Sequence, residues 1–165
     1  MNVFALSALL ILTTALLVGQ ASPNPCAESG SKVGGDAAAL RPAGVLLAIT
    51  SPRAGEMVSE ALPLASVTVS VDYWGPRLVA PTIANRVDDY HLVFFLDADD
   101  SAYVGTMVPT PRCNASIIHS ANTSATFDHV IHGWHTVYVL LVGSNDVSVN
   151  PPVAASASFV ASEGN

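Results

Sequence analysis

The chain has 165 residues, of which six are basic and 13 acidic, and its formal net charge is −7. This length suits a single domain with one hydrophobic core. The scattered basic residues form no stripe that would neutralise phosphates, and the acidic balance opposes an anionic membrane surface, so nucleic acid and acidic membranes are poor partners.

The first residues have the pattern of a targeting signal. Residues 3–18 are almost wholly apolar and uncharged, and Gly19 and Ala21 supply the small side chains of a signal-peptidase site. We therefore predict a signal peptide over residues 1–21 and a secreted protein, extracellular or lumenal. The alternative is a retained membrane anchor, because the apolar run is close to the ~17 residues of a short span. No later segment is long and apolar enough to predict a span.

Two cysteines, Cys26 and Cys113, lie in the predicted mature chain. An even number of cysteines in an oxidising compartment permits a disulfide. We expect a Cys26–Cys113 bridge, which would close a long loop and add ~3 kcal/mol to stability; the alternative is two unpaired thiols. Residues 22–42 are rich in Ser, Gly, Pro and Ala, which predicts a flexible linker.

From residue 43 onward, short apolar runs are separated by Pro and Gly breaks. Residues 45–50 form the first run, and residues 65–72 alternate with Val67, Val69 and Val71 on one face, as a half-buried strand does. Residues 90–97 are apolar on both faces, which predicts a strand in the middle of a sheet. Further strands are predicted over residues 103–108, 124–130, 134–142 and about 155–161.

Seven short strands with turn signals between them predict an all-β, antiparallel β-sandwich over residues 43–162, with residues 163–165 as a tail. No stretch shows the sustained period of 3.6 residues that predicts a helix. An up-and-down β-barrel is the alternative architecture.

Three short motifs follow one another in the strands: ITSP at 49–52, YHLVFFLD at 90–97 and GWHTVYV at 133–139. In this order, with alternating valines after the first, they resemble immunoglobulin-like (Ig-like), fibronectin-III-like β-sandwich modules of secreted and surface proteins. The resemblance covers about residues 45–161 and implies an Ig-like fold of about seven strands. The chain departs from that pattern after the central strand, where Asp97 and Ala98 stand in place of Asp-Gly.

Two histidines, His91 and His135, lie on strands that we expect to be central neighbours. Adjacent imidazoles could bind copper or zinc, with His132 or Met107 as a further ligand, so extracellular metal binding is the alternative function. We expect a structural role instead, because His135 follows a Gly at the start of the penultimate strand. Ig-like folds often place there a side chain that hydrogen-bonds back to the chain.

An acidic run, Asp97, Asp99 and Asp100, supplies the hard oxygen ligands that calcium prefers. The run lacks the Gly and distal Glu of a helix-loop-helix calcium site. We expect a solvated acidic turn, with a surface calcium site involving Asn145 or Asp146 as the alternative.

No catalytic motif is present: the chain has no G-x-S-x-G, no phosphate-binding Gly loop and no activating partner for either cysteine. We therefore predict no enzyme and no cofactor, and a secreted or surface module that binds protein or carbohydrate. Tyr73, Trp74 and Tyr103 are the candidate contacts, since flat rings stack on sugars and anchor interfaces. Asn114 and Asn122 begin N-glycosylation motifs.

Overall fold

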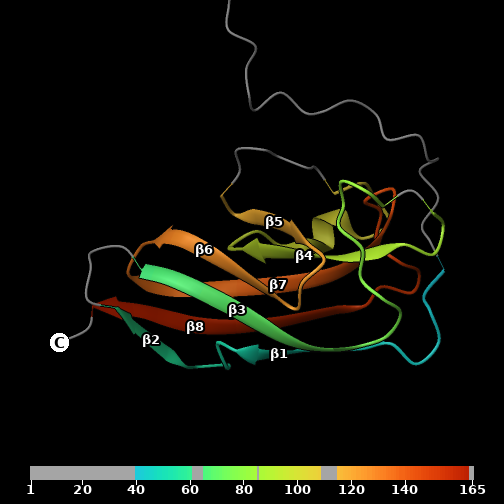
Figure 1. Cartoon of the computed structure of the whole chain (residues 1–165). Coiled ribbons are helices and arrows are strands. Elements are labelled where there is room, and N and C mark those ends of the chain that lie inside the picture. Colours follow the sequence, from blue (N-terminus) through green and yellow to red (C-terminus); the bar gives the residue numbers. More distant parts are fainter. Residues whose placement is uncertain (1–39, 61–64, 85, 109–114, 164–165) are drawn as a thin grey trace, which may run out of the picture.

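Two β-sheets pack face to face in the computed structural model, which describes residues 40–60, 65–84, 86–108 and 115–163 (Figure 1). Within this part of the chain, a three-stranded sheet has the order β1-β3-β6 and a five-stranded sheet the order β2-β8-β7-β4-β5. The fold is an all-β, Ig-like β-sandwich, as predicted. The strands, in chain order, are β1 (Leu46–Ser51), β2 (Met57–Glu60), β3 (Ala65–Trp74), β4 (Tyr90–Leu96), β5 (Ile117–Ser120), β6 (Ser124–Val130), β7 (Gly133–Gly143) and β8 (Ala154–Glu163).

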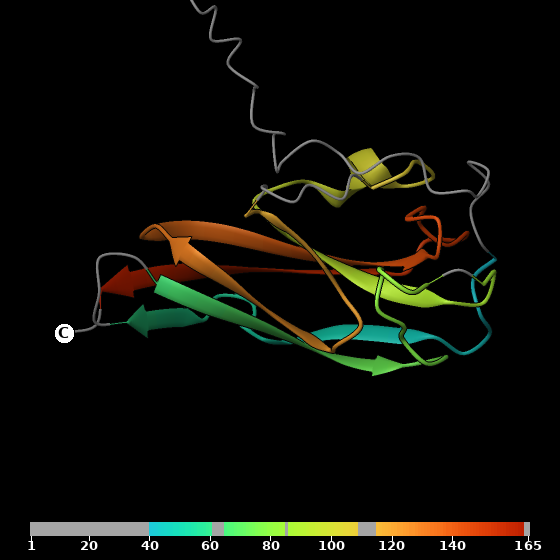
Figure 2. The same cartoon turned by 45° about the horizontal axis from the view of Figure 1, so that its top comes forward.

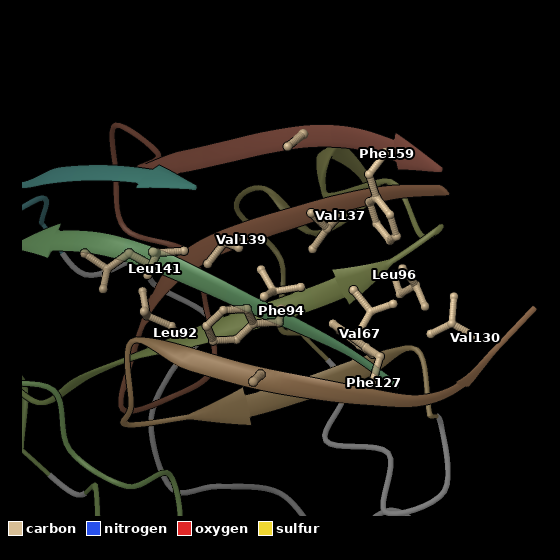
Figure 3. Packing of buried hydrophobic residues seen from close by; sticks show 14 of the residues in the cluster. Val67, Leu92, Phe94, Leu96, Phe127, Val130, Val137, Val139, Leu141 and Phe159 are labelled. Carbon is tan, nitrogen blue, oxygen red and sulfur yellow. The ribbon is translucent and has the colours of Figure 1, made fainter. Parts of the chain in front are cut away.

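The main core lies between the two sheets and follows from the alternation of the strands. In β3, alternate valines are buried and the residues between them are exposed or half-buried. Figure 3 shows Leu92 and Phe94 of β4 and Val137 and Val139 of β7 in the same packed layer as Phe127 of β6. Residues two apart on a strand share a face, so this pattern commits one face of each sheet to the core.

A second, smaller core covers the outer face of the five-stranded sheet, which explains why β4 is apolar on both faces. Val93 and Phe95 point into it, together with Leu140 of β7. A short 3-10 helix, η1 (Asp100–Tyr103), covers this second core, and the Tyr103 ring stacks on Phe95 with centroids 5.4 Å apart. In Figure 2, η1 (yellow) lies over the five-stranded sheet, away from the three-stranded one.

The prediction of a strand over residues 103–108 is wrong. The chain forms η1 and then a loop, in which Gly105 has a φ of 75° that a strand does not use. Asp99 begins η1 by accepting a hydrogen bond from the Ser101 N–H at 2.9 Å. Tyr103 and Val108 pack into the second core, and Met107 forms only an isolated bridge with Val147, so this apolar segment is not a strand of either sheet.

Two short edge strands, β2 and β5, were not expected from the sequence. β2 pairs with β8 in parallel, whereas all the other strand pairs within the described residues are antiparallel. The chain thus leaves the three-stranded sheet after β1 and joins the other sheet at β2. The Pro52-to-Gly55 turn makes this change, with Gly55 at φ 77°.

Several sequence predictions lie outside the described residues, namely the signal peptide, most of the linker, Cys26, Cys113 and Asn114. At the end of the predicted linker, the Arg41 N–H donates to the Asn150 carbonyl at 3.0 Å. In the described segments, no helix has the length and apolarity needed to cross a bilayer.

Candidate functional site

Three side chains that can bind a metal meet at one end of the second core: His91, His119 and Asp146. His91 Nε2 lies 3.0 Å from His119 Nδ1 and 2.9 Å from Asp146 Oδ1. His119 Nδ1 lies 3.5 Å from the same carboxylate oxygen. The two rings are tilted by 34°, with centroids 5.2 Å apart, and the three candidate ligand atoms all lie within 4.8 Å of one another.

The backbone brings these residues together from three elements. His91 lies on the same face of β4 as Val93, and Val93 is the cross-strand partner of His119 on β5. Asp146 lies in the turn between β7 and β8 and has a φ of 61°, a left-handed conformation that Asp tolerates better than most residues. The Asp146 N–H donates to the Gly143 carbonyl at 3.0 Å, and its own carbonyl accepts from the Val108 N–H at 2.8 Å.

The cluster is buried: the exposed fractions of its side chains are 0% for His91, 6% for His119 and 2% for Asp146. Buried polar side chains are costly unless they are paired with one another or bind an ion. Two imidazole nitrogens and one carboxylate oxygen can either share protons or hold a transition metal. We refer to these three residues as the His-His-Asp cluster.

His91 and His135 do not meet, because they project from opposite faces of the five-stranded sheet. His91 faces the second core, whereas His135 packs against Phe159 in the main core, with ring centroids 5.5 Å apart. Along β7, His135 lies seven residues from Val142, the cross-strand partner of His91, which corresponds to about 23 Å. The prediction that these two strands are neighbours is confirmed. The two rings are nevertheless apart, because they lie on opposite faces of the sheet and at distant positions along the strands.

His135 has the structural role that its position suggested. Its Nε2 donates to the carbonyl of Ile131, four residues upstream, at 2.7 Å, because a carbonyl oxygen can only accept. This confirms the expected hydrogen bond back to the chain. His132 is half-buried, and its Nδ1 lies 3.5 Å from Oε1 of Glu163, so the structure does not gather it with either of the other two histidines.

The acidic residues considered for calcium have separate contacts. Asp97 binds β7, with Oδ1 accepting from the Thr136 N–H and Oδ2 lying beside His135. The hydrogen bonds from Ser101 lower the pKa of Asp99, whereas burial and the neighbouring Asp99 charge raise the pKa of Asp100. Asp146 belongs to the His-His-Asp cluster.

A second candidate site is an exposed groove on the three-stranded sheet. It has a volume of about 500 Å³ and is lined by Leu46, Leu47, Ala48, Asp72, Tyr73 and Trp74. Leu46 and Trp74 are cross-strand partners at the end of the β1–β3 pair, and their exposed fractions are 68% and 74%. We call this feature the Trp74 groove.

The three aromatic residues proposed as ligand contacts differ in exposure. Trp74 is open to solvent, whereas Tyr103 is committed to the second core. Tyr73 is half-buried, and its hydroxyl donates to the Pro76 carbonyl at 2.9 Å. Burial, together with the nearby Tyr90, raises the pKa of Tyr73 to about 12.

Another exposed tryptophan, Trp134, was missed by the sequence reasoning. It lies on the outer face of the five-stranded sheet with an exposed fraction of 73%. Val160 of β8 is the cross-strand partner of both Trp134 and Met57, so these three residues form an apolar row. The signal was present in the sequence: side chains alternate between the two faces of a strand, so Trp134 must point outward if His135 points into the core.

Asn122, the start of one glycosylation motif, is exposed in the turn between β5 and β6. Its backbone N–H donates to the Ser120 hydroxyl at 3.0 Å. The side chain is therefore placed where an acceptor Asn is accessible, and its modification remains a prediction.

No protein-family model matches the chain, and no curated protein matches its sequence. Among solved structures, it is similar to fibronectin(III)-like modules of Clostridium thermocellum CbhA, with a TM-score of 0.43 and 14% identity over 72% of this chain and 96% of that one. It is also similar to the PKD domain of human KIAA0319, with a TM-score of 0.34 and 12% identity over 83% of this chain and 94% of that one.

Proposed function

We propose that the protein is a secreted, non-catalytic binding module that recognises a neutral carbohydrate chain at the Trp74 groove. The carrying observation is the Leu46–Trp74 pair, in which two large apolar side chains stand exposed beside a groove. Ligand sites are concave and lined mostly by apolar and aromatic side chains, and these two residues line such a groove together. The apolar run at residues 3–18 supports secretion.

The groove combines the two kinds of contact that a sugar requires. The Trp74 indole offers a flat apolar face, on which the C–H face of a sugar ring can stack. Asp72, which lines the same groove, offers carboxylate oxygens that accept hydrogen bonds from sugar hydroxyls. The net charge of −7 opposes polyanions such as sulfated glycans, so the ligand class is neutral.

The position of the groove favours an extended ligand. β1 is an edge strand of its sheet within the described residues, and the groove follows the ends of β1 and β3. A chain of several sugar units can lie along such an open edge. A protein partner would instead use the free backbone groups of β1 to extend the sheet.

The test is binding of the secreted protein to a panel of neutral polysaccharides and oligosaccharides, followed by titration of the best ligand. Trp74→Ala is expected to weaken binding by about tenfold or more, the range of a central aromatic contact. Trp134→Ala is the matched control, because it removes an equally exposed tryptophan from the other sheet and should leave affinity unchanged.

Two results would contradict the proposal. One is loss of glycan binding in Trp134→Ala with full binding in Trp74→Ala, which would move the site to the five-stranded sheet. The other is no binding to any glycan by a correctly folded wild-type protein. A stable complex with a protein that depends on the β1 edge but not on Trp74 would show the alternative class of partner.

A further inference from the structure

We propose that the His-His-Asp cluster is a binding site for a divalent transition-metal ion such as Zn²⁺. This site is independent of the carbohydrate proposal, since it lies on the other sheet. Its ligands are His91 Nε2, His119 Nδ1 and Asp146 Oδ1.

The separations of the three donor atoms match one coordination shell. With metal–nitrogen and metal–oxygen bonds of about 2.0–2.1 Å, adjacent ligands of a tetrahedral ion lie about 3.3 Å apart. The observed separations are 2.9, 3.0 and 3.5 Å, so small side-chain rotations would place all three atoms around one ion. No shift of the strands is required.

The donor types select the class of metal. Two imidazoles and one carboxylate suit Zn²⁺, Cu²⁺, Ni²⁺ or Fe²⁺, whereas Ca²⁺ and Mg²⁺ prefer shells made of oxygens. Each histidine would bind as the neutral ring and the carboxylate as the anion, so binding releases any proton that the cluster holds. The single carboxylate charge offsets half of the charge of the ion.

The surroundings hold the ligands in place. The cluster lies at the end of the apolar second core, and the backbone fixes His91 and His119 on paired strands. The Asp146 turn is bound to the covering loop through the Val108 N–H and through the bridge between Met107 and Val147. Such a buried setting strengthens the electrostatic attraction between the carboxylate and a cation, because little water screens the two charges.

A proton-sharing cluster without metal is the competing interpretation, because the same distances suit hydrogen bonds. The two interpretations differ in what they predict for added metal. A site of this kind should bind one ion per chain and stabilise the folded state, since ions that bind only the folded protein raise its melting temperature. A hydrogen-bonded cluster should show neither effect.

The experiment titrates Zn²⁺ alone into the chelator-treated, dialysed full chain by calorimetry, with thermal unfolding measured in parallel. We expect one ion per chain and a rise in Tm of about 5 °C or more at saturation. His119→Gln and Asp146→Asn should lower the affinity by at least the ~10–100-fold that loss of a supporting partner costs at metal sites. His132→Gln is the matched control and should bind as the wild type does.

Co²⁺ provides a second readout that needs no variant. Bound to two nitrogens and one oxygen, it should show visible d–d bands without a thiolate charge-transfer band, and Zn²⁺ should displace it. The proposal is overturned by absence of binding, by equal affinity in wild type and His119→Gln, or by a thiolate band that assigns the ion to the cysteines. Should Asp146→Asn not fold, His119→Gln and the Co²⁺ spectrum still decide.

Discussion

His135 and Asp97 connect the start of β7 to the residue that follows β4, with the imidazole Nδ1 2.7 Å from the carboxylate Oδ2. The other carboxylate oxygen accepts from the Thr136 N–H at 2.9 Å, and the Asp97 N–H donates to the Thr136 carbonyl at 2.8 Å. Asp97 adopts a φ of 57°, a left-handed conformation that positions its side chain. One residue therefore fixes the end of a central strand.

Replacing Asp97 should destabilise the fold. Asp97→Ala removes the acceptor of the Thr136 N–H and the partner of His135 Nδ1, so we expect the free energy of unfolding to fall by about 1–3 kcal/mol. Urea denaturation measures the difference. Asp88→Ala is the control, since that carboxylate is 76% exposed, and its removal should change stability by no more than about 0.5 kcal/mol. Equal effects of the two substitutions would refute the role of Asp97.

The main core should be sensitive to truncation at Phe127, which is 1% exposed. Phe127→Ala removes a ring packed between the sheets and should cost about 3–5 kcal/mol, the usual range for a large side chain lost from a core. Val87→Ala, at a position 86% exposed, serves as the control. Denaturant midpoints report both values, and a loss below about 1 kcal/mol for Phe127→Ala would contradict the packing shown in Figure 3.

High pH should destabilise the protein through Tyr73. Its pKa is raised from 10.0 to about 12, so the folded state favours the protonated phenol. The contribution of Tyr73 is complete below pH 10 and is lost as the pH rises through about 12, because the unfolded chain ionises first. Unfolding measured across this interval in wild type and Tyr73→Phe tests the prediction. The variant should lose less stability, and an identical loss in both proteins would argue against it.

Intact mass should report the processing of the chain secreted from a eukaryotic host. We expect a product that begins at Ser22 and contains the Cys26–Cys113 bridge, two hydrogens lighter than the reduced form. Glycosidase should lower the mass of the wild type by the glycan at Asn122. In Asn122→Gln, glycosidase should remove no mass from this position, so any remaining loss would come from a glycan at Asn114. A full-length, membrane-retained product would instead identify residues 3–18 as an anchor.

Strand positions were largely predictable because period-2 alternation is local. Residues 65–72, 90–97 and 134–142 were recognised as strands from alternation or from continuous apolar runs, and they became β3, β4 and β7. β2 and β5 were missed because four residues give too little alternation to detect. The loop at residues 103–108 was misread because an apolar cover has the same composition as a strand.

The sequence by itself determined most of the strands and their buried faces, since alternating Val, Phe and Leu must bury one face of each strand wherever the strands pair. Only the tertiary structure separates a two-sheet sandwich from a closed barrel, because both bury one face of every strand. The sequence also placed His91 on a central strand and His135 at its hydrogen-bonded position. Only the tertiary structure decided which polar groups meet. The strand register and the face on which each side chain lies place His135 in the main core. β5 and the β7–β8 turn bring His119 and Asp146 to His91. These contacts join residues far apart in the chain, and no local pattern encodes them.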